Sequence, residues 1–387
     1  MLWKPQNIIQ RSNSEIMSYK FSPSCLKCSI AIILLLLLHP CYAQQDFSRV
    51  DDWLARNIKV VGGREVLVIY KDGQIVYNKS INDLNVRQKM IGRMINRRQG
   101  KPDTDSALNF TDSTREPIAS CSKWLSAALV MTFVDEGKLN LEDSIGKYLP
   151  IMNKYGKGGI KIKYCLSHLT AINTGDLKES RDIINNASSM NDAIESVAKA
   201  DMEGVPGKTF HYSSAGLQIA AAIIEKISGK KFNDLFEERI AKPCNMVNTD
   251  FGAARVPLAA GSAFSTPKDY MNFLSMILND GKYKGVQVLS NASVIEMQKN
   301  RITKDITIAY TPDETKSMGY GYGEWLNNDT AGDQRSDMAT SPGLFGSLPW
   351  INNKEHYAAF LMVLNIQYKG RQEKYNDLMR RVDEAMQ

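Results

Sequence analysis

The apolar run over residues 124–134 constrains the fold of this chain more than any other stretch. Leu125, Leu129 and Phe133 are four apart, as on one side of a helix, and Ala127 and Val130 place apolar side chains on other sides. A helix that is apolar nearly all round is buried among other elements, because no side of it is suited to water. We therefore expect a central helix here, enclosed by the rest of a large domain.

Ser120 and Lys123 stand immediately before this run. If the helix begins at Ser120, both side chains leave one face, so an amine lies against a hydroxyl. A serine hydroxyl is a weak nucleophile until a base takes its proton, and a lysine can be that base only where burial or nearby charge keeps some of its amine neutral. The helix start also offers the Ser120 amide and a positive dipole end to an oxyanion. The pair predicts an activated nucleophile.

The Ser-x-x-Lys spacing is not specific by itself. It occurs six times, beginning at Ser24, Ser120, Ser144, Ser196, Ser228 and Ser265. A capped helix start is the ordinary explanation of such a copy. At Ser265 the sequence supports it directly, because Pro267 suits the first position of a helix. What distinguishes Ser120 is the set of segments that accompany it.

Three segments in order carry a resemblance to a known family: IASCSK (118–123), VPGKTFHYSSAG (205–216) and SPGLFGSLPWI (341–351). Together with connecting phrases over residues 65–365, they resemble the serine beta-lactamase and penicillin-binding-protein family. They resemble in particular its branch of class C beta-lactamases, secreted esterases and D-amino-acid peptidases. The resemblance implies acyl transfer, in which Ser120 attacks a carbonyl and water releases the acyl group.

The second segment implies a role for Tyr212. In the family a tyrosine at this place points at the serine and the lysine. A phenol near an ammonium is favoured as its phenolate, so Tyr212 with Lys123 is expected to pass the Ser120 proton to the leaving group. The family's asparagine two residues further on is Ser214 here, a shorter hydrogen-bond donor.

The third segment departs from the family at its first residue. The usual word is Lys-x-Gly or His-x-Gly, but Ser341 begins it here and Gly343 ends it. The cation that would hold a substrate carboxylate is therefore missing. The resemblance still implies that the amides of Ser120 and Leu344 hold the oxyanion, and that Ser214, Ser341 and Gly343 contact the substrate.

The expected fold is an α/β (α+β) arrangement of the beta-lactamase/DD-peptidase type, an antiparallel sheet flanked by helices. Residues 65–70 and 74–79 predict a hairpin around Lys71-Asp72-Gly73. A mostly helical region over about 138–286 is inserted between the two parts of the sheet. The remaining expectations are a helix over 45–57, a long loop or insertion over 82–114, a helix opening at Pro267, a strand entering near 319–325, an antiparallel pair over 341–351 and 357–365, and a helix over 371–386.

Residues 1–43 have the order of a secretory signal peptide: basic residues, an apolar stretch over 29–38, then a small-x-Ala end. The apolar stretch is short for a membrane span, so we expect no span after its removal. Residues 44–387 are then one hydrolase domain, secreted or periplasmic. Residues 1–43 carry a net charge of +3, which leaves +3 of the formal +6 on the remainder and gives no argument for nucleic-acid binding.

The basic residues that remain are concentrated over 87–101. A solvated face is the ordinary explanation of such a cluster, and a site for an anionic partner is the alternative. Cys121, Cys165 and Cys244 are an odd number outside the signal segment, so we expect buried thiols and no disulfide framework. The four histidines show no metal-ligand spacing; no metal or cofactor is expected, and His168 is interpreted as structural.

Two classes of function remain open at this point. The first is an exported serine hydrolase that acts on a small-molecule ester, amide or peptide. The second is a non-catalytic, penicillin-binding-like module, suggested by serine at positions 214 and 341 where the family has asparagine and a cation.

Overall fold

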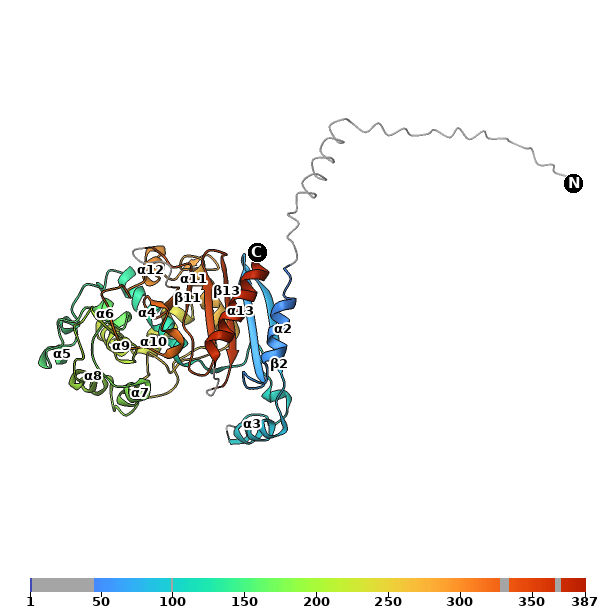
Figure 1. Ribbon diagram of the computed structural model, residues 1–387, viewed down its shortest axis with the longest axis horizontal. Coiled ribbons are helices and arrows are strands. Elements are labelled where there is room, and N and C mark those ends of the chain that lie inside the picture. The colour runs from blue at the N-terminus through green and yellow to red at the C-terminus, as the bar shows by residue number, and fades with distance from the viewer. Residues whose placement is uncertain (2–44, 99, 328–333, 366–369) are drawn as a thin grey trace, which may run out of the picture. The chain divides into compact units, whose positions relative to one another are not determined.

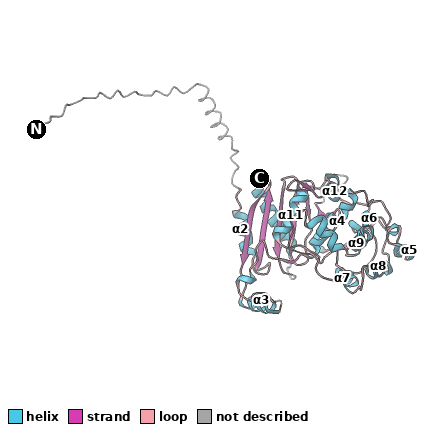
Figure 2. Ribbon diagram, turned by 180° about the vertical axis from the view of Figure 1, so that it is seen from behind, coloured by secondary structure: helices cyan, strands magenta, loops and turns pink. Residues whose placement is uncertain are grey.

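The protein contains a seven-stranded antiparallel sheet (Figures 1 and 2). The structure is a computed structural model that describes residues 1, 45–98, 100–327, 334–365 and 370–387. The predicted signal segment, apart from Met1, lies outside the described residues. The strands are β1 (Arg64–Lys71), β2 (Gln74–Asn82), β9 (Gly319–Tyr320), β10 (Trp325–Leu326), β11 (Met338–Thr340), β12 (Leu348–Asn352) and β13 (Tyr357–Val363). Their spatial order is β2-β1-β13-β12-β11-β10-β9.

The two ends of the domain meet in the middle of this sheet. The predicted N-terminal hairpin β1–β2 is present, and β1 also pairs with β13, with Glu65 opposite Val363 and Lys71 opposite Tyr357. The predicted pair β12–β13 closes with Asn352 opposite Tyr357. The long segment between β2 and β9 therefore leaves the sheet and returns to its other edge.

Both faces of the sheet are covered by helices. On one face, α2 (Ser48–Asn57) and α13 (Arg371–Met386) pack on apolar residues of β1, β12 and β13. On the other, α11 (Pro267–Leu278) packs on β1 and β13, where the Tyr270 ring stacks on Phe360 at 4.8 Å between centroids. The helices expected at the two termini and at Pro267 are thus present. Burial on both faces explains why five consecutive residues of β1, from 65 to 69, are buried.

The expected central helix is α4 (Ser122–Asp135), with every residue from Ser122 to Phe133 buried. It packs against α9 (Ala215–Ser228), itself almost wholly buried. The inserted region is mainly helical, as predicted. Its other helices are α5 (Pro150–Lys154), α6 (Ile162–Leu166), α7 (Leu177–Asn185), α8 (Met190–Lys199) and α10 (Phe232–Phe236), followed after α11 by α12 (Asn291–Met297). Among the described residues, no helix has the length and apolar character needed to cross a membrane.

Two local expectations are wrong. Residues 82–114, expected as a long loop or insertion, contain the helix α3 (Val86–Arg98). None of its residues is buried, so it lacks the core-facing stripe by which helices are usually recognised. The strand expected over 341–351 begins only at Leu348. Before it the chain forms a turn, in which the Gly343 N–H donates to the Ser347 oxygen at 2.8 Å and Gly346 has a φ of +100°.

Candidate active site

Ser120 lies in a tight turn just before the central helix. Residues Ala119–Cys121 form a 3-10 turn, so α4 begins at Ser122, two residues after the predicted start. Ala119 has a φ of +46°, a conformation that costs a non-glycine residue free energy and is held by its surroundings. The Ser122 hydroxyl donates to the Ala119 oxygen at 2.6 Å, and the Tyr270 hydroxyl donates to the Cys121 oxygen at 2.8 Å. These contacts fix the turn that carries Ser120.

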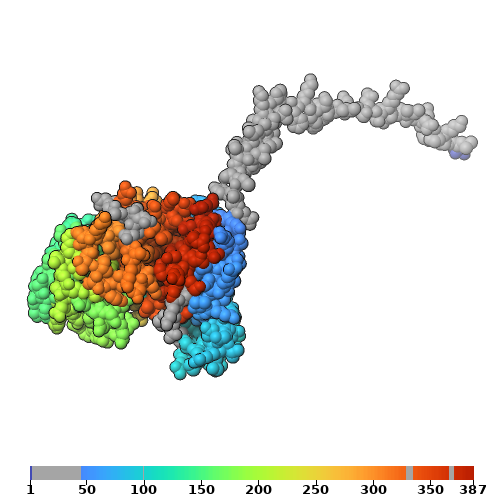
Figure 3. All heavy atoms as spheres, viewed as in Figure 1, coloured from blue at the N-terminus to red at the C-terminus, as the bar shows by residue number. Residues whose placement is uncertain are grey.

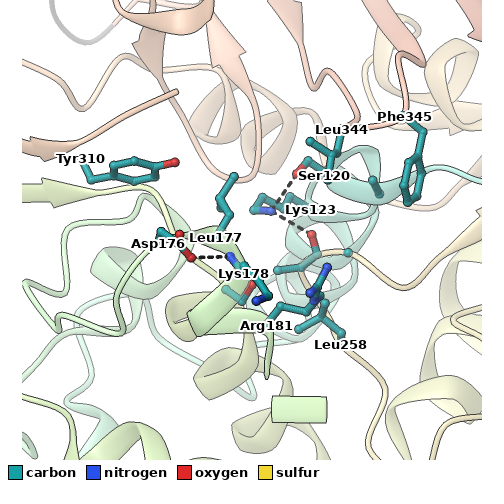
Figure 4. Close-up of a pocket in the computed structure, with 14 residues that line it drawn as sticks. Ser120, Lys123, Asp176, Leu177, Lys178, Arg181, Leu258, Tyr310, Leu344 and Phe345 are labelled. Atoms are coloured by element: carbon teal, nitrogen blue, oxygen red, sulfur yellow. Dashed lines mark hydrogen bonds between the residues drawn. The ribbon is translucent and has the colours of Figure 1, made fainter. Parts of the chain in front are cut away.

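Lys123 reaches back from the first turn of α4 to the serine. Its Nζ lies 3.1 Å from the Ser120 Oγ and donates to the Ala260 oxygen at 2.8 Å (Figure 4). The side chain is 2% exposed. Burial disfavours the charged amine and lowers the pKa of Lys123 to about 7. Near neutral pH a large fraction of this lysine is therefore a neutral amine within reach of the hydroxyl proton.

Tyr212 lies between β4 (Thr209–His211) and α9, beside the same pair. The Lys123 Nζ is 4.7 Å from the centroid of its ring. Burial raises the pKa of Tyr212, and the hydrogen bond of its phenol with the Ser120 side chain opposes that rise only in part. This direction is opposite to the one expected for a phenolate: burial in a dry site favours the phenol that keeps its proton.

His168 has the structural role expected of it. Its Nδ1 accepts the Ser213 N–H at 3.4 Å, and its Nε2 lies 3.1 Å from the Tyr320 hydroxyl. The ring packs 4.6 Å from that of Tyr212, between centroids. Burial lowers the pKa of His168 well below its usual value, so the imidazole is neutral. It packs against the Tyr212 ring as a structural neighbour.

Ser341 does not contact the cleft, contrary to the prediction of a substrate contact. It is 1% exposed, and its hydroxyl donates to the main-chain oxygens of Ser120 at 3.1 Å and Gly323 at 3.2 Å. Ser214, by contrast, borders the cleft, although it is largely buried. Its N–H donates to the Ser180 hydroxyl at 2.9 Å.

Gly343 allows the loop of residues 341–347 to lie against the nucleophile turn. A Cβ there would be 2.5 Å from the Ile118 oxygen, so no larger residue fits. Arg371 holds the loop from the other side, with Nη1 donating to the Leu344 oxygen at 2.9 Å. Within the described parts of the chain, no acceptor is found for the N–H of Ser120 or of Leu344. Both residues border the cleft, as the two predicted oxyanion donors require.

The cleft has a volume of about 320 Å³ and opens beside Ser120 (Figure 4). Its lining residues are Ala119, Ser120, Lys123, Asp176, Leu177, Lys178, Arg181, Ser214, Leu258, Ala260, Gly261, Tyr310, Leu344 and Phe345. Within the described chain, no cluster of three or more His, Cys, Asp or Glu side chains is arranged to hold a metal ion.

Sequence reasoning missed one wall of this cleft, the start of α7. Asp176 caps that helix, accepting the N–H groups of Lys178 and Glu179 at 2.8 and 2.9 Å, and Glu179 completes a capping box. An Asp-x-x-Glu pattern is a recognisable helix start, so the helix was detectable. That it faces Ser120 depends on tertiary packing. The Ala260 oxygen was also missed, because a main-chain acceptor carries no residue signal.

Comparisons with known proteins bear on the family and the fold of the chain. The family model described as Beta-lactamase matches residues 59–383. Protein flp of Staphylococcus aureus (strain MRSA252) is 26% identical over 160 residues, which are 41% of this chain; the match spans only about a third (32%) of that relative.

Two solved structures share the fold. One, from Bacteroides dorei DSM 17855 and provisionally assigned as a beta-lactamase, has a TM-score of 0.72 at 23% identity and covers 88% of this chain and 99% of its own. EstCE1, described as a hydrolase with promiscuous acyltransferase activity, has a TM-score of 0.68 at 17% identity and covers 86% of this chain and 97% of its own. The chain belongs to the beta-lactamase family, a family of serine hydrolases.

Proposed function

We propose that this protein hydrolyses a small ester or amide through an acyl-enzyme on Ser120. The observation that carries the proposal is the buried Lys123 amine, 3.1 Å from the Ser120 Oγ, with its pKa lowered to about 7. A base of that pKa is suited to proton transfer near neutral pH, because much of it is unprotonated while it still accepts a proton readily.

The chemical steps follow from this geometry. Neutral Lys123 takes the hydroxyl proton as the Ser120 Oγ attacks the carbonyl carbon, and the N–H groups of Ser120 and Leu344 hold the oxyanion. The proton then passes from Lys123 through the neutral Tyr212 phenol to the oxygen or nitrogen of the leaving group. Water attacks the resulting acyl-enzyme, the product acid leaves, and the proton from that water restores the Ser120 hydroxyl.

We expect a substrate that needs no carboxylate for binding next to residues 341–351, the third segment of the family resemblance. Ser341 stands there and uses its hydroxyl on main-chain oxygens, so it offers the substrate no cation. Small acyl esters and uncharged amides are the preferred substrates on this basis. Export through the signal segment belongs to the same proposal, and N-terminal sequencing of exported protein should find a start near Gln44.

The second candidate is a binding module that keeps the fold without turnover, favoured by the serines at positions 214 and 341. Incubation with a fluorophosphonate, followed by mass spectrometry of the Ser120 peptide, distinguishes the two. We expect a covalent adduct on Ser120 that is absent from Ser120→Ala and retained in Ser228→Ala, a change at a copy of the same spacing. If intact protein gives no adduct with either a fluorophosphonate or a labelled penicillin, the binding module is correct.

A further inference from the structure

Helix α3 presents large apolar side chains to solvent. Val86 is 85% exposed and Met90 is 66% exposed, and Ile91, Met94 and Ile95 are exposed as well. Figures 1 and 3 show α3 projecting from the end of the domain, away from the helical region that borders the cleft. Scattered apolar residues on a surface are ordinary, but several on one short helix mark an interaction site.

The orientation of α3 is fixed by contacts along its inner side. Gly92 packs so closely on Leu108 that an added Cβ would lie 2.8 Å from its Cδ2 atom. The Gln88 side chain donates to the Gly62 oxygen at 3.1 Å. Val86, Met90 and Met94, which follow one another every four residues, form a ridge along a side that these contacts leave uncovered.

Basic side chains flank this ridge. Residues 86–105 contain six lysines and arginines against two aspartates, a net charge of +4. A row of them is held in place by aspartates: Lys89 and Arg93 contact Asp105 at 3.3 and 2.6 Å, and Arg97 contacts Asp103. Within the described chain, Arg87 and Arg98 make no ion pair. The surface therefore offers apolar side chains with basic side chains beside them.

We propose that α3 docks the protein on an anionic lipid surface, with the ridge of Val86, Met90 and Met94 entering the interface and the basic residues contacting lipid phosphates. A helix with this distribution of charge and apolar groups lies in the plane of a membrane interface. Long Arg and Lys stems contribute further apolar contact while their charged ends stay at the headgroups.

A lipid surface suits the ridge better than a protein partner. The helix has 13 residues, a length of about 20 Å, and projects from the end of the domain (Figure 1). A stable protein interface covers about 800 Å² on each partner with well-packed surfaces, which a single projecting helix does not supply. A fluid bilayer needs no matching shape. A soluble polyanion would complement the charge but would leave the apolar ridge uncovered.

Vesicle sedimentation tests this proposal on Asp46–Gln387, which forms a compact unit by itself, so that the apolar stretch over residues 29–38 contributes nothing. Binding should be strong to vesicles of phosphatidylcholine with phosphatidylglycerol, weak to phosphatidylcholine alone, and reduced by salt. Met90→Asp/Met94→Asp and Arg87→Gln/Arg98→Gln should each lower the affinity at least about tenfold. Val247→Asp, a change at an apolar residue of 79% exposure elsewhere, should not.

If α3 binds something other than a lipid surface, the measurements give different results. Equal vesicle binding by all variants, or none by the unchanged protein, overturns the proposal. Self-association that is seen in sedimentation equilibrium and disappears in Met90→Asp/Met94→Asp also overturns the proposal. It would show that α3 binds a second copy of the chain. Binding of polyphosphate that depends on the arginines but not on the methionines, without vesicle binding, identifies a polyanion site instead. Turnover at Ser120 should be equal in all these variants, since α3 does not line the cleft.

Discussion

The Ser341 hydroxyl donates to the main-chain oxygen of Ser120 at 3.1 Å, so the residue in place of the family's cation holds the nucleophile turn. We predict that Ser341→Ala lowers kcat about tenfold with little change in KM, because the turn loses a support and a small displacement of the nucleophile is costly. Loss of the buried hydrogen bonds should also remove about 1 kcal/mol of stability. Steady-state kinetics and thermal melting measure the two effects. A rise in KM with unchanged kcat would instead assign Ser341 to substrate binding.

Lys123→Arg tests the base. Arginine keeps the charge and approximate reach but cannot release its proton, so the rate should fall about 10²-fold or more. In the unchanged protein, kcat/KM should rise with pH through about 7, because protonated Lys123 predominates below that pH and cannot accept the serine proton. The variant should lose this rise. Ser228→Ala is the control. It should retain turnover, because the Ser228 hydroxyl only donates to the Ile224 oxygen within α9.

If Lys123→Arg keeps most of its activity while its melting curve matches that of the unchanged protein, the mechanism is wrong. His168 or His211 would then be the next candidate base. The His211 Nε2 donates to the Gly175 oxygen at 3.0 Å, and its Nδ1 lies beside Glu203. Both ring nitrogens of His168 have partners as well, the Tyr320 hydroxyl and the Ser213 N–H.

Tyr212→Phe removes the hydroxyl and keeps the ring, which packs 5.0 Å from that of Trp325, between centroids. We expect a loss comparable to that of Lys123→Arg, because the proton path to the leaving group is interrupted. The double variant should fall little below the worse single variant, since groups that act as a unit are not additive. Rates of the unchanged protein, the two single variants and the double variant form a double-mutant cycle. Fully additive losses would place Tyr212 outside the proton path.

Gly343→Ala tests the oxyanion site. The added Cβ would lie 2.5 Å from the Ile118 oxygen and 3.2 Å from the Cys121 Sγ, so the loop must move and carry the Leu344 N–H away. Loss of one oxyanion donor is expected to lower kcat about 10²-fold. Gly159→Ala is the matched control, because a Cβ there meets no atom within 4 Å. Unchanged kcat in a folded Gly343→Ala protein would remove the Leu344 amide from the mechanism.

Substrate preference follows from the missing cation. We predict that a short-chain nitrophenyl ester is hydrolysed with a much higher kcat/KM than nitrocefin, whose carboxylate finds no cation at Ser341. Paired assays on one preparation, with Ser120→Ala as the blank, make the comparison. Nitrocefin hydrolysis at rates rivalling the ester would show that another group of the cleft holds the carboxylate, with Lys178 and Arg181 the cations available there.

Local sequence patterns were sufficient for much of the fold. The hairpin over 65–79, the buried α4 and the helix opening at Pro267 each follow from residues within one segment. The proximity of Ser120 and Lys123 also follows from helix geometry. Tyr212 was placed by resemblance to a family, since nothing local says that residue 212 meets residue 123.

The features that were missed depend on contacts between distant segments. The acceptors of the Ser341 hydroxyl are main-chain oxygens of residues 120 and 323, which no side-chain pattern identifies. Likewise, the high pKa of Tyr212 comes from the burial of the site as a whole rather than from its charged neighbour. The exposed α3 was missed for the opposite reason, because its apolar residues do not face a core.

The buried thiol of Cys121, next to the nucleophile, has a practical consequence. Burial raises its pKa and excludes reagents, so an alkylating agent reaches it only when the turn around Ser120 opens. The alkylation rate of its peptide, divided by that of a free thiol, therefore gives the free energy of that opening. Cys165 and Cys244 report on other parts of the helical region in the same experiment. The protein thus contains native probes of whether acylation of Ser120 tightens the site alone or the whole domain.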